Sequence, residues 1–275
     1  MTVKEKPKLL AFWLIVAASV ATIVSLGVST GGSTPVAATG GVLKIGTADS
    51  PPWVLFNTKK RTFYGPSITL FNAVGKALHK KVQYVNTGYS TAIPGLQAHQ
   101  FDIIGLPIFN TPERMKVIDF VLWTNSGNCY IALKKNTKVN SLSDFNNSNV
   151  KMAVQVGASI ETDFPKKYPD AKVYSIQSQG AAAVVEEVLS GRADITDIDA
   201  PLVYKYLSVY PQLKSIPGPK ACLARPDFPH QIGMGIRKDS PPAFRATLQK
   251  VVKKLRPTLQ KQIAKYSAAK YIKLP

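Results

Sequence analysis

The chain of 275 residues is long enough for two ordinary domains or one large one. Hydrophobic residues make up 45% of it and charged residues 19%, a globular composition that excludes a disordered or low-complexity chain. The formal net charge is +19, but the lysines are spread over the whole sequence instead of forming one basic run with interleaved aromatic residues. We therefore expect a solvated basic surface and no binding to nucleic acid.

The first residues have the pattern of an export signal. Three lysines within the first eight residues precede Leu9–Val28, which contains no charged residue, and a stretch of small residues ends at Ala38. This pattern predicts a signal peptide over residues 1–38 and a periplasmic protein of the Gram-negative type. Twenty apolar residues are also long enough to remain as a membrane anchor, which is the alternative.

The two cysteines, Cys129 and Cys222, both lie in the part predicted to be exported. An oxidising compartment permits a disulfide between them, and two buried unpaired thiols are the alternative. Two cysteines do not complete a zinc site, and the three histidines share no ligand spacing with them. We expect neither a metal nor another cofactor.

The first half of the chain alternates predicted strands and helices. Apolar runs predict strands over 42–49, 81–87 and 101–106, the last ended by Pro107, and helical spacing predicts helices over 67–78 and 90–100. Strands that alternate with helices in this way are typical of an α/β domain with a parallel sheet.

The same alternation begins again after Gly127. Strands are predicted over 129–134, 150–156, 172–176, 193–198, 213–216 and 232–237, and helices over 179–190, 201–208, 242–255 and 258–269. Pro257 separates the last two helices, and a proline-rich loop is predicted over 217–229. The sequence therefore predicts two α/β units.

A helix start follows the strand over 101–106. Thr111 is a suitable N-cap, Pro112 fits the first turn, and Arg114 lies in the same turn. Open α/β folds bind ligands where a strand ends beside a helix N-terminus, and the planar guanidinium group of arginine pairs well with a carboxylate. An ordinary surface arginine is the alternative.

Nine short motifs, taken in chain order, resemble those of the polar amino-acid (family 3) solute-binding proteins. These are the exported receptors of bacterial ABC importers. The similarity covers roughly residues 42–270, and the motifs are Lys44–Trp53, Ile93–Gln97, Phe101–Asp102, Thr111–Arg114, Ile118–Phe120, Val154–Gly157, Gly191–Asp194, Asp199–Pro201 and Gly233–Lys238.

The resemblance implies the type II periplasmic binding protein fold. In this α/β fold two lobes are joined by two crossover segments that act as a hinge, and the ligand lies in the cleft between the lobes. Residues 40–127 plus 231–275 would form lobe 1, and residues 128–230 would form lobe 2.

The resemblance also implies a ligand site. Arg114 would hold the α-carboxylate of the ligand with help from the hydroxyl group of Ser159, and Asp199 would hold the α-amino group. A purely structural N-cap is the alternative for Asp199. Trp53 would stack on the ligand, and Tyr89 occupies the position of a frequent tryptophan.

Three further positions are ligand-binding candidates. Asp49 ends the first predicted strand. Pro107 and Phe109 stand where the family usually places small or hydroxyl residues. Pro107 still offers its carbonyl oxygen to an amine, and Phe109 adds an apolar wall, so the ligand could also be aromatic or apolar.

The resemblance implies a monomeric binding protein, not an enzyme, that captures an amino acid or a related carboxylate and delivers it to an ABC permease. One alternative is a periplasmic enzyme on the same scaffold, resembling the cyclohexadienyl dehydratases, in which Glu161 and Asp197 would be the extra acids. The other alternative is a sensory module held by an uncleaved N-terminal anchor.

Overall fold

The computed structural model describes residues 40–177 and 180–267. The predicted signal peptide over 1–38 and the end of the last predicted helix lie outside the described residues. The element order of the described part alternates strands and helices over most of its length.

One mixed sheet carries most of the strands. Its order is β4 (Lys81–Asn86), β1 (Val42–Thr47), β5 (Ile103–Phe109), β11 (Asp227–Ile236), β6 (Asp119–Leu133), β9 (Ile195–Asp199), β7 (Lys151–Gln155) and β8 (Lys172–Ile176), and β10 (Leu213–Ile216) also pairs with β6. A separate hairpin consists of β2 (Leu55–Asn57) and β3 (Thr62–Tyr64).

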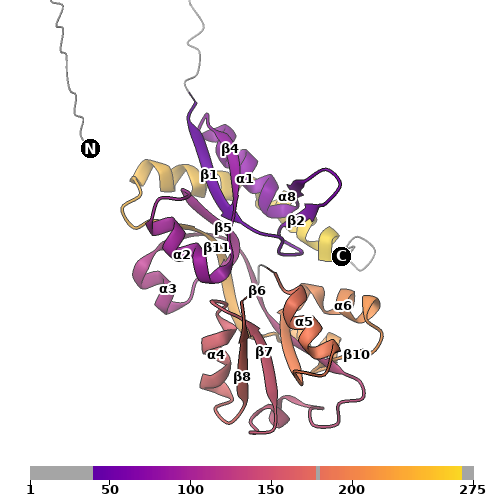
Figure 1. Ribbon diagram of the computed structural model, residues 1–275. Coiled ribbons are helices and arrows are strands. Elements are labelled where there is room, and N and C mark those ends of the chain that lie inside the picture. Colours follow the sequence, from indigo (N-terminus) through magenta and orange to yellow (C-terminus); the bar gives the residue numbers. More distant parts are fainter. Residues whose placement is uncertain (1–39, 178–179, 268–275) are drawn as a thin grey trace, which may run out of the picture. The chain divides into compact units, whose positions relative to one another are not determined.

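The helices form two groups, one near the β4 end of this sheet and one near the β8 end. Those of the first group are α1 (Pro66–Ala77), α2 (Tyr89–Gln97), α3 (Pro112–Val117) and α8 (Pro242–Ser267). Those of the second are α4 (Ile160–Lys167), α5 (Ala182–Leu189), α6 (Val203–Val209) and α7 (Pro219–Ala224), with short 3-10 turns η1 (Leu142–Phe145) and η2 (Ala200–Leu202). In Figure 1 α4, α5 and α6 are grouped with β7, β8 and β10.

The fold has two lobes joined through β6 and β11. β1 pairs in parallel with β4 and β5, and β7 pairs in parallel with β8 and β9. β11 pairs antiparallel with β5 and β6, and β6 pairs antiparallel with β9, so these two strands connect both parallel groups. The predicted two-lobe α/β fold is therefore confirmed.

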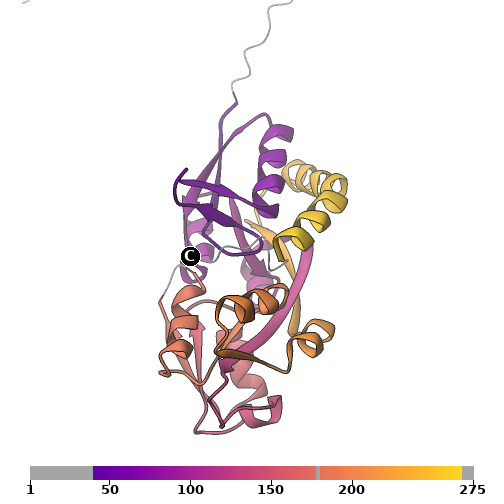
Figure 2. The same ribbon diagram turned by 90° about the vertical axis from the view of Figure 1, so that its right-hand side faces the viewer.

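Each lobe has its own hydrophobic core. Leu43, Phe71 and Leu248 belong to a cluster of the first lobe, which includes the contact between α1 and α8. Figure 2 shows α8, in yellow, beside α1. Val185 and Phe164 belong to two clusters of the second lobe. Separate cores allow each lobe to stay intact while the angle between them changes.

β5 runs through Pro107 to Phe109, three residues beyond the predicted end at Leu106. The pairing with β11 explains why the strand tolerates a proline. Gly235 is opposite Ile104, but Gly233 is already opposite Ile108, so the register shifts over the segment that contains Pro107. A strand residue at such a bulge makes no regular ladder hydrogen bond, and the missing N–H of proline is not needed there.

The prediction of two C-terminal helices was wrong, because α8 is one helix with Pro257 in its interior. A proline in a helix interior costs about 3 kcal/mol. Val251 and Val252 before Pro257 and Leu259 after it are all buried. Each buried side chain of this size contributes about 1.5–3 kcal/mol, which is enough to keep both parts of the helix in register with the core.

Gly127 lies inside β6, which begins at Asp119, so the strand predicted to begin at Cys129 starts ten residues earlier. A Cβ atom at this position would lie 2.8 Å from the carbonyl oxygen of Asp227, so glycine permits the close approach of β11. The predicted proline-rich loop over 217–229 is also partly ordered, because it contains α7 and the first residues of β11.

Candidate functional site

A pocket lies between the two lobes. Its first-lobe wall comes from the loop after β1, from α2, from the end of β5 and from α3, with Ser50, Pro51, Tyr89, Pro107, Phe109 and Arg114. The second-lobe wall contains Asn128, Gln155, Ala158, Ser159, Ile160, Gly180, Ala181, Val184, Asp197, Ile198, Asp199, Leu202 and Tyr206.

Arg114 extends from the first turn of α3 to the opposite lobe. Thr111 is the N-cap of this helix, and its hydroxyl oxygen accepts a hydrogen bond from the backbone N–H of Arg114 at 3.4 Å. The guanidinium group donates from Nη1 to the carbonyl of Phe109 at 3.0 Å and from Nη2 to the carbonyl of Gly157 at 2.8 Å. Burial lowers the pKa of Arg114, but a guanidinium group remains charged at any physiological pH.

Asp199 ends β9 and is held by two donors. Trp53 donates from Nε1 to Oδ2 at 3.1 Å, and Ser126 donates from Oγ to Oδ1 at 3.0 Å. Burial raises the pKa of Asp199 to about 6, and these two hydrogen bonds oppose the rise. The carboxylate is therefore oriented by hydrogen bonds but has no ion pair with a basic side chain among the residues that the structure describes.

Asp197 lies two residues before Asp199 on β9, so both side chains are on the same face of the strand. Asn128 of β6 donates from Nδ2 to Oδ2 of Asp197 at 2.6 Å. Burial, and then the charge of Asp199, raise the pKa of Asp197 to about 7. The pocket is therefore lined by two carboxyl groups and one guanidinium group.

Aromatic side chains form much of the remaining wall. Tyr89, Phe109 and Tyr206 line the pocket. Burial raises the pKa of both tyrosines, so their hydroxyl groups are neutral at physiological pH. The pocket thus combines a few charged groups with a largely apolar wall, as is usual for small-molecule sites.

Six of the predicted ligand-binding residues come together in this pocket. They are Arg114, Asp199, Ser159, Pro107, Phe109 and Tyr89. Ser159 stands at the N-cap position of α4, but its side chain makes no capping hydrogen bond. Glu161 instead accepts from the backbone N–H of Gly157 at 2.7 Å.

The other two predicted residues are not among those that line the pocket. Trp53 is fully buried, and its indole N–H donates a hydrogen bond to the carboxylate of Asp199. Its position therefore supports Asp199 and does not provide the stacking contact with the ligand that was expected. Asp49 accepts from the backbone N–H of Phe56 at 2.9 Å and thereby supports the start of the β2–β3 hairpin. Of the two, Trp53 contacts a pocket residue directly, through its hydrogen bond to Asp199 at 3.1 Å.

Sequence reasoning missed Asn128, Gln155 and Tyr206, and it placed Asp197 only in the alternative reading as an enzyme. The alternation of β9 was an available signal, because Asp197 shares a strand face with Asp199. No comparable signal identifies Asn128, because its proximity to Asp197 arises from pairing between β6 and β9.

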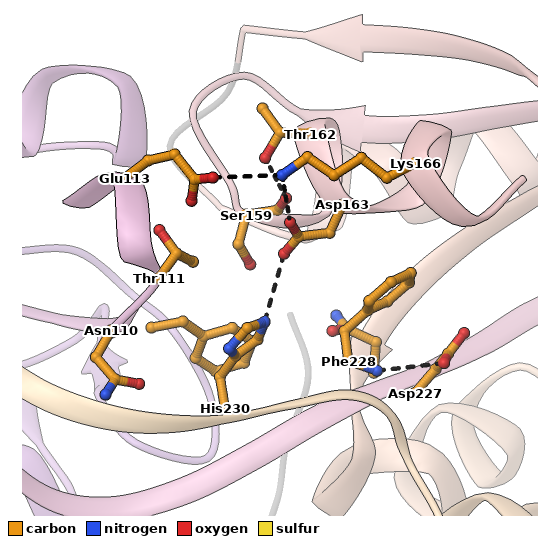
Figure 3. A network of polar contacts seen from close by, with 12 residues as sticks. Asn110, Thr111, Glu113, Ser159, Thr162, Asp163, Lys166, Asp227, Phe228 and His230 are labelled. Carbon is orange, nitrogen blue, oxygen red and sulfur yellow. Dashed lines mark hydrogen bonds and ion pairs between the residues drawn. The ribbon is translucent and has the colours of Figure 1, made fainter. Parts of the chain in front are cut away.

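Polar contacts between the lobes continue at the rim of the pocket (Figure 3). Lys166 of α4 lies 3.4 Å from Glu113 of α3 and 3.5 Å from Asp163. Asp163 also lies 3.4 Å from Nε2 of His230 on β11, whose ring packs against Phe109. The lobes are therefore in direct contact around the pocket.

Cys129 and Cys222 are joined by a disulfide, with their Cα atoms 5.8 Å apart. The bond ties α7 to β6 within the hydrophobic core of the second lobe. Among residues 40–177 and 180–267, no group of three or more potential ligand side chains is arranged to hold a metal ion. No described helix is both long and apolar enough to cross a membrane.

The fold and this pocket define a two-lobe solute receptor, and comparison with known proteins identifies its family. The family model of the bacterial extracellular solute-binding proteins, family 3, matches residues 43–269. The chain belongs to this family.

Individual relatives are more distant. A probable histidine-binding protein of Campylobacter jejuni is 26% identical over 63% of this chain, and a probable amino-acid ABC transporter-binding protein of Haemophilus influenzae is 25% identical over 62%. The matched segments span 66% and 64% of those relatives' own lengths.

Solved structures match most of the described chain. An ancestral amino acid-binding protein, a precursor of cyclohexadienyl dehydratase, is 28% identical, with a TM-score of 0.71 over 82% of this chain and 96% of that one. An arginine-bound substrate-binding protein of an amino-acid ABC transporter from Streptococcus pneumoniae has a TM-score of 0.72 over 85% and 97% of the two chains, at 20% identity. The likeness to the second structure shows the fold alone.

Proposed function

We propose that this protein captures an amino acid between its two lobes and delivers it to the permease of an ABC importer. The observation that carries the proposal is the pair of opposite charges in one buried pocket, Arg114 from the first lobe and Asp199 from the second. A zwitterion needs a fixed cation and a fixed anion, and exclusion of water strengthens both pairings. The names of the relatives support an amino-acid ligand and an ABC transporter.

In this proposal each end of the ligand has defined partners. The α-carboxylate pairs with Arg114 and accepts from the hydroxyl group of Ser159. Each Nη atom of Arg114 carries a second N–H besides the one donated to Phe109 or Gly157. The α-amino group donates to Asp199 and to the carbonyl oxygen of Pro107. Tyr89 and Phe109 enclose the carbon skeleton. Contacts to both lobes would favour the closed arrangement over the open one.

Titration calorimetry of the full-length chain with the common amino acids tests this function. We expect at least one to bind with a dissociation constant of about 1 μM or below, which corresponds to about −8 kcal/mol. Arg114→Ala should weaken that binding by about 100-fold, because a buried carboxylate loses its counter-charge. Arg256→Ala removes the same charge from an exposed position of α8 and is the matched control. Equal affinity of both variants would contradict the assigned site.

We also propose that the protein acts as a monomer in the periplasm of a Gram-negative-type cell after cleavage of residues 1–38. Membership of an extracellular family supports export. Mass spectrometry of the protein from a periplasmic extract should find a chain that starts just after Ala38. An N-terminus at Met1 in the membrane fraction would instead support a retained anchor, as would be needed for a sensory module.

The lobe bounds are part of the proposal. We assign residues 40–127 plus 231–275 to lobe 1 and residues 128–230 to lobe 2. The hinge would then bend where β6 and β11 pair, near Gly127 and His230. Solution scattering with and without a bound amino acid should report a smaller radius of gyration in the bound state.

We infer that the protein is not an enzyme. One feature of the pocket nevertheless favours testing the dehydratase alternative. Asp197 is a pocket carboxyl group with a raised pKa, as general acids and bases often have. A solved relative is named as a precursor of cyclohexadienyl dehydratase. Incubation of the full-length chain with prephenate or arogenate should leave both compounds unchanged, and formation of product would establish the enzyme.

A further inference from the structure

We propose that Asp197 and Asn128 form a second cation-binding subsite, which holds a positively charged side chain, so that the ligand is an amino acid with net positive charge. This inference rests on the proposed function, because it takes the carboxylate and α-amino ends of the ligand as held by Arg114 and Asp199. It adds the chemical class of the remaining part of the ligand.

The first argument is the charge of the pocket wall. Three of its described lining residues carry groups that are charged when ionised near neutral pH, namely Arg114, Asp197 and Asp199. A zwitterionic ligand head matches Arg114 and Asp199 and leaves the charge of Asp197 unbalanced. A buried carboxylate without a counter-charge is unfavourable, so one more positive charge on the ligand makes the closed pocket neutral.

The second argument is an unused acceptor beside Asp197. An ionised carboxylate only accepts hydrogen bonds, and the amide nitrogen of Asn128 faces Asp197 at 2.6 Å. This orientation fixes the amide oxygen of Asn128 as the remaining polar atom. That oxygen is buried and has no hydrogen-bond partner among the residues that the structure describes, and the side chain lines the pocket with only 5% exposure.

The Asp197 carboxylate and the Asn128 amide oxygen together suit a ligand group that carries several N–H donors. Asp197 supplies a negative charge, and the Asn128 amide oxygen supplies a neutral acceptor next to it. A guanidinium or ammonium group donates in several directions and carries the charge that the pocket lacks. A neutral or acidic side chain offers fewer donors and leaves Asp197 either uncompensated or protonated.

The test compares L-arginine with L-citrulline, which has nearly the same shape but a neutral urea group. Titration calorimetry of the full-length chain at pH 8 should show arginine binding at least 30-fold more tightly than citrulline. L-lysine should also bind more tightly than L-norleucine. This comparison uses only the natural sequence, so it does not depend on whether a variant folds.

Two variants then locate the selectivity. Asp197→Asn should reduce the ratio of arginine to citrulline affinity at least tenfold, and Asn128→Ala should reduce it less. Arg114→Ala should weaken both ligands by a similar factor, because it acts on the common carboxylate. Circular dichroism of each variant reports whether it is folded.

The outcomes separate the two proposals. Equal binding of arginine and citrulline, or citrulline the tighter, would overturn the cation subsite while leaving amino-acid capture in place. Tight binding only of neutral or acidic amino acids would do the same. No binding of any amino acid would overturn the proposed function and this inference with it.

Discussion

Trp53 shows how a residue can serve a pocket that it does not line. Its indole ring is fully buried and packs edge-on against Trp123, with the ring centroids 5.8 Å apart. The indole N–H has only one direction in which to donate, and it points to Asp199. Tertiary packing thus fixes one oxygen of the carboxylate that we assign to the ligand's amino group.

Trp53→Phe should therefore weaken amino-acid binding by about three- to 30-fold. A hydrogen bond to a charged group contributes about 1.5–3 kcal/mol, and we expect only part of this free energy to be lost from ligand binding. Trp123→Phe removes an indole of the same core cluster that makes no bond to Asp199, and it is the control. Calorimetry with the best ligand measures both. If the two variants lose the same affinity, the effect of Trp53 is packing and not orientation.

Asp197 is a residue whose ionisation works against folding in the ligand-free protein. Its pKa is raised from 3.8 in the unfolded chain to about 7 in the fold. A group with a raised folded pKa contributes stability below the unfolded pKa, and this contribution is lost as the pH rises through the folded pKa. Ligand-free protein should therefore lose stability between about pH 4 and pH 7.

Asp197→Asn should remove most of that loss. At pH 8 the ligand-free variant should be more stable than the natural protein by about 1–4 kcal/mol, and near pH 4 the difference should vanish. Urea denaturation at pH 4, 6 and 8 measures both proteins. Asp239→Asn removes a carboxylate that is 76% exposed and paired with Arg237, and it should have little effect at any of these pH values. A constant difference at all three pH values would show that burial does not raise the pKa of Asp197.

At the scale of the elements, the turn between β7 and α4 brings the lobes together. Gly157 has a positive φ of 81°, which favours glycine, and a Cβ atom there would lie 2.5 Å from the backbone nitrogen of Ser90 on α2. Its carbonyl oxygen accepts from Arg114. The absence of a side chain at this position therefore allows α2 and α3 to close over the pocket.

Gly157→Ala should hold the lobes apart and weaken amino-acid binding by about tenfold or more, because about 1.4 kcal/mol of lost closure already gives that factor. Gly191→Ala is a matched control, because its φ of 77° is equally unfavourable for alanine but its Cβ would meet no atom within 4 Å. Calorimetry gives the affinities, and solution scattering gives the size of the bound state. Similar affinity in both variants would mean that the close approach at Gly157 does not control closure.

Proline illustrates what could be predicted about elements and what could not. Pro112 was correctly placed in the first turn of α3, because its fixed φ and missing N–H suit that position. Pro107 and Pro257 were predicted to end elements, but β5 and α8 continue through them. In both cases contacts with distant parts of the chain outweigh a local preference, and a single sequence does not reveal those contacts.

At the scale of the whole molecule, the disulfide is the covalent constraint of the second lobe. It joins residues separated by 93 positions, and both cysteines are buried in the same core cluster. A crosslink over so long a loop removes much conformational freedom from the unfolded chain. The bond is thus expected to contribute to stability without touching the ligand.

Cys129→Ala combined with Cys222→Ala should lower the free energy of unfolding by about 2–5 kcal/mol and leave amino-acid affinity nearly unchanged. Thermal melts and calorimetry measure the two properties. The natural protein melted in excess reductant keeps both sulfur atoms in the core, so it separates loss of the crosslink from loss of volume. An unchanged melting temperature in reductant would contradict a stabilising role.

The fold class and the family resemblance follow from the order of residues along the chain. Periodic apolar residues, caps and short motifs act locally along the chain, so the alternating elements, the start of α3 and the candidates Arg114 and Asp199 could be found from them. The set of side chains that share the pocket depends on the folded arrangement of the two lobes. Trp53 donates a hydrogen bond to Asp199 and does not line the pocket, and Asn128 lies next to Asp197 because β6 pairs with β9. Such contacts join residues far apart in sequence, and their geometry depends on packing of the whole chain.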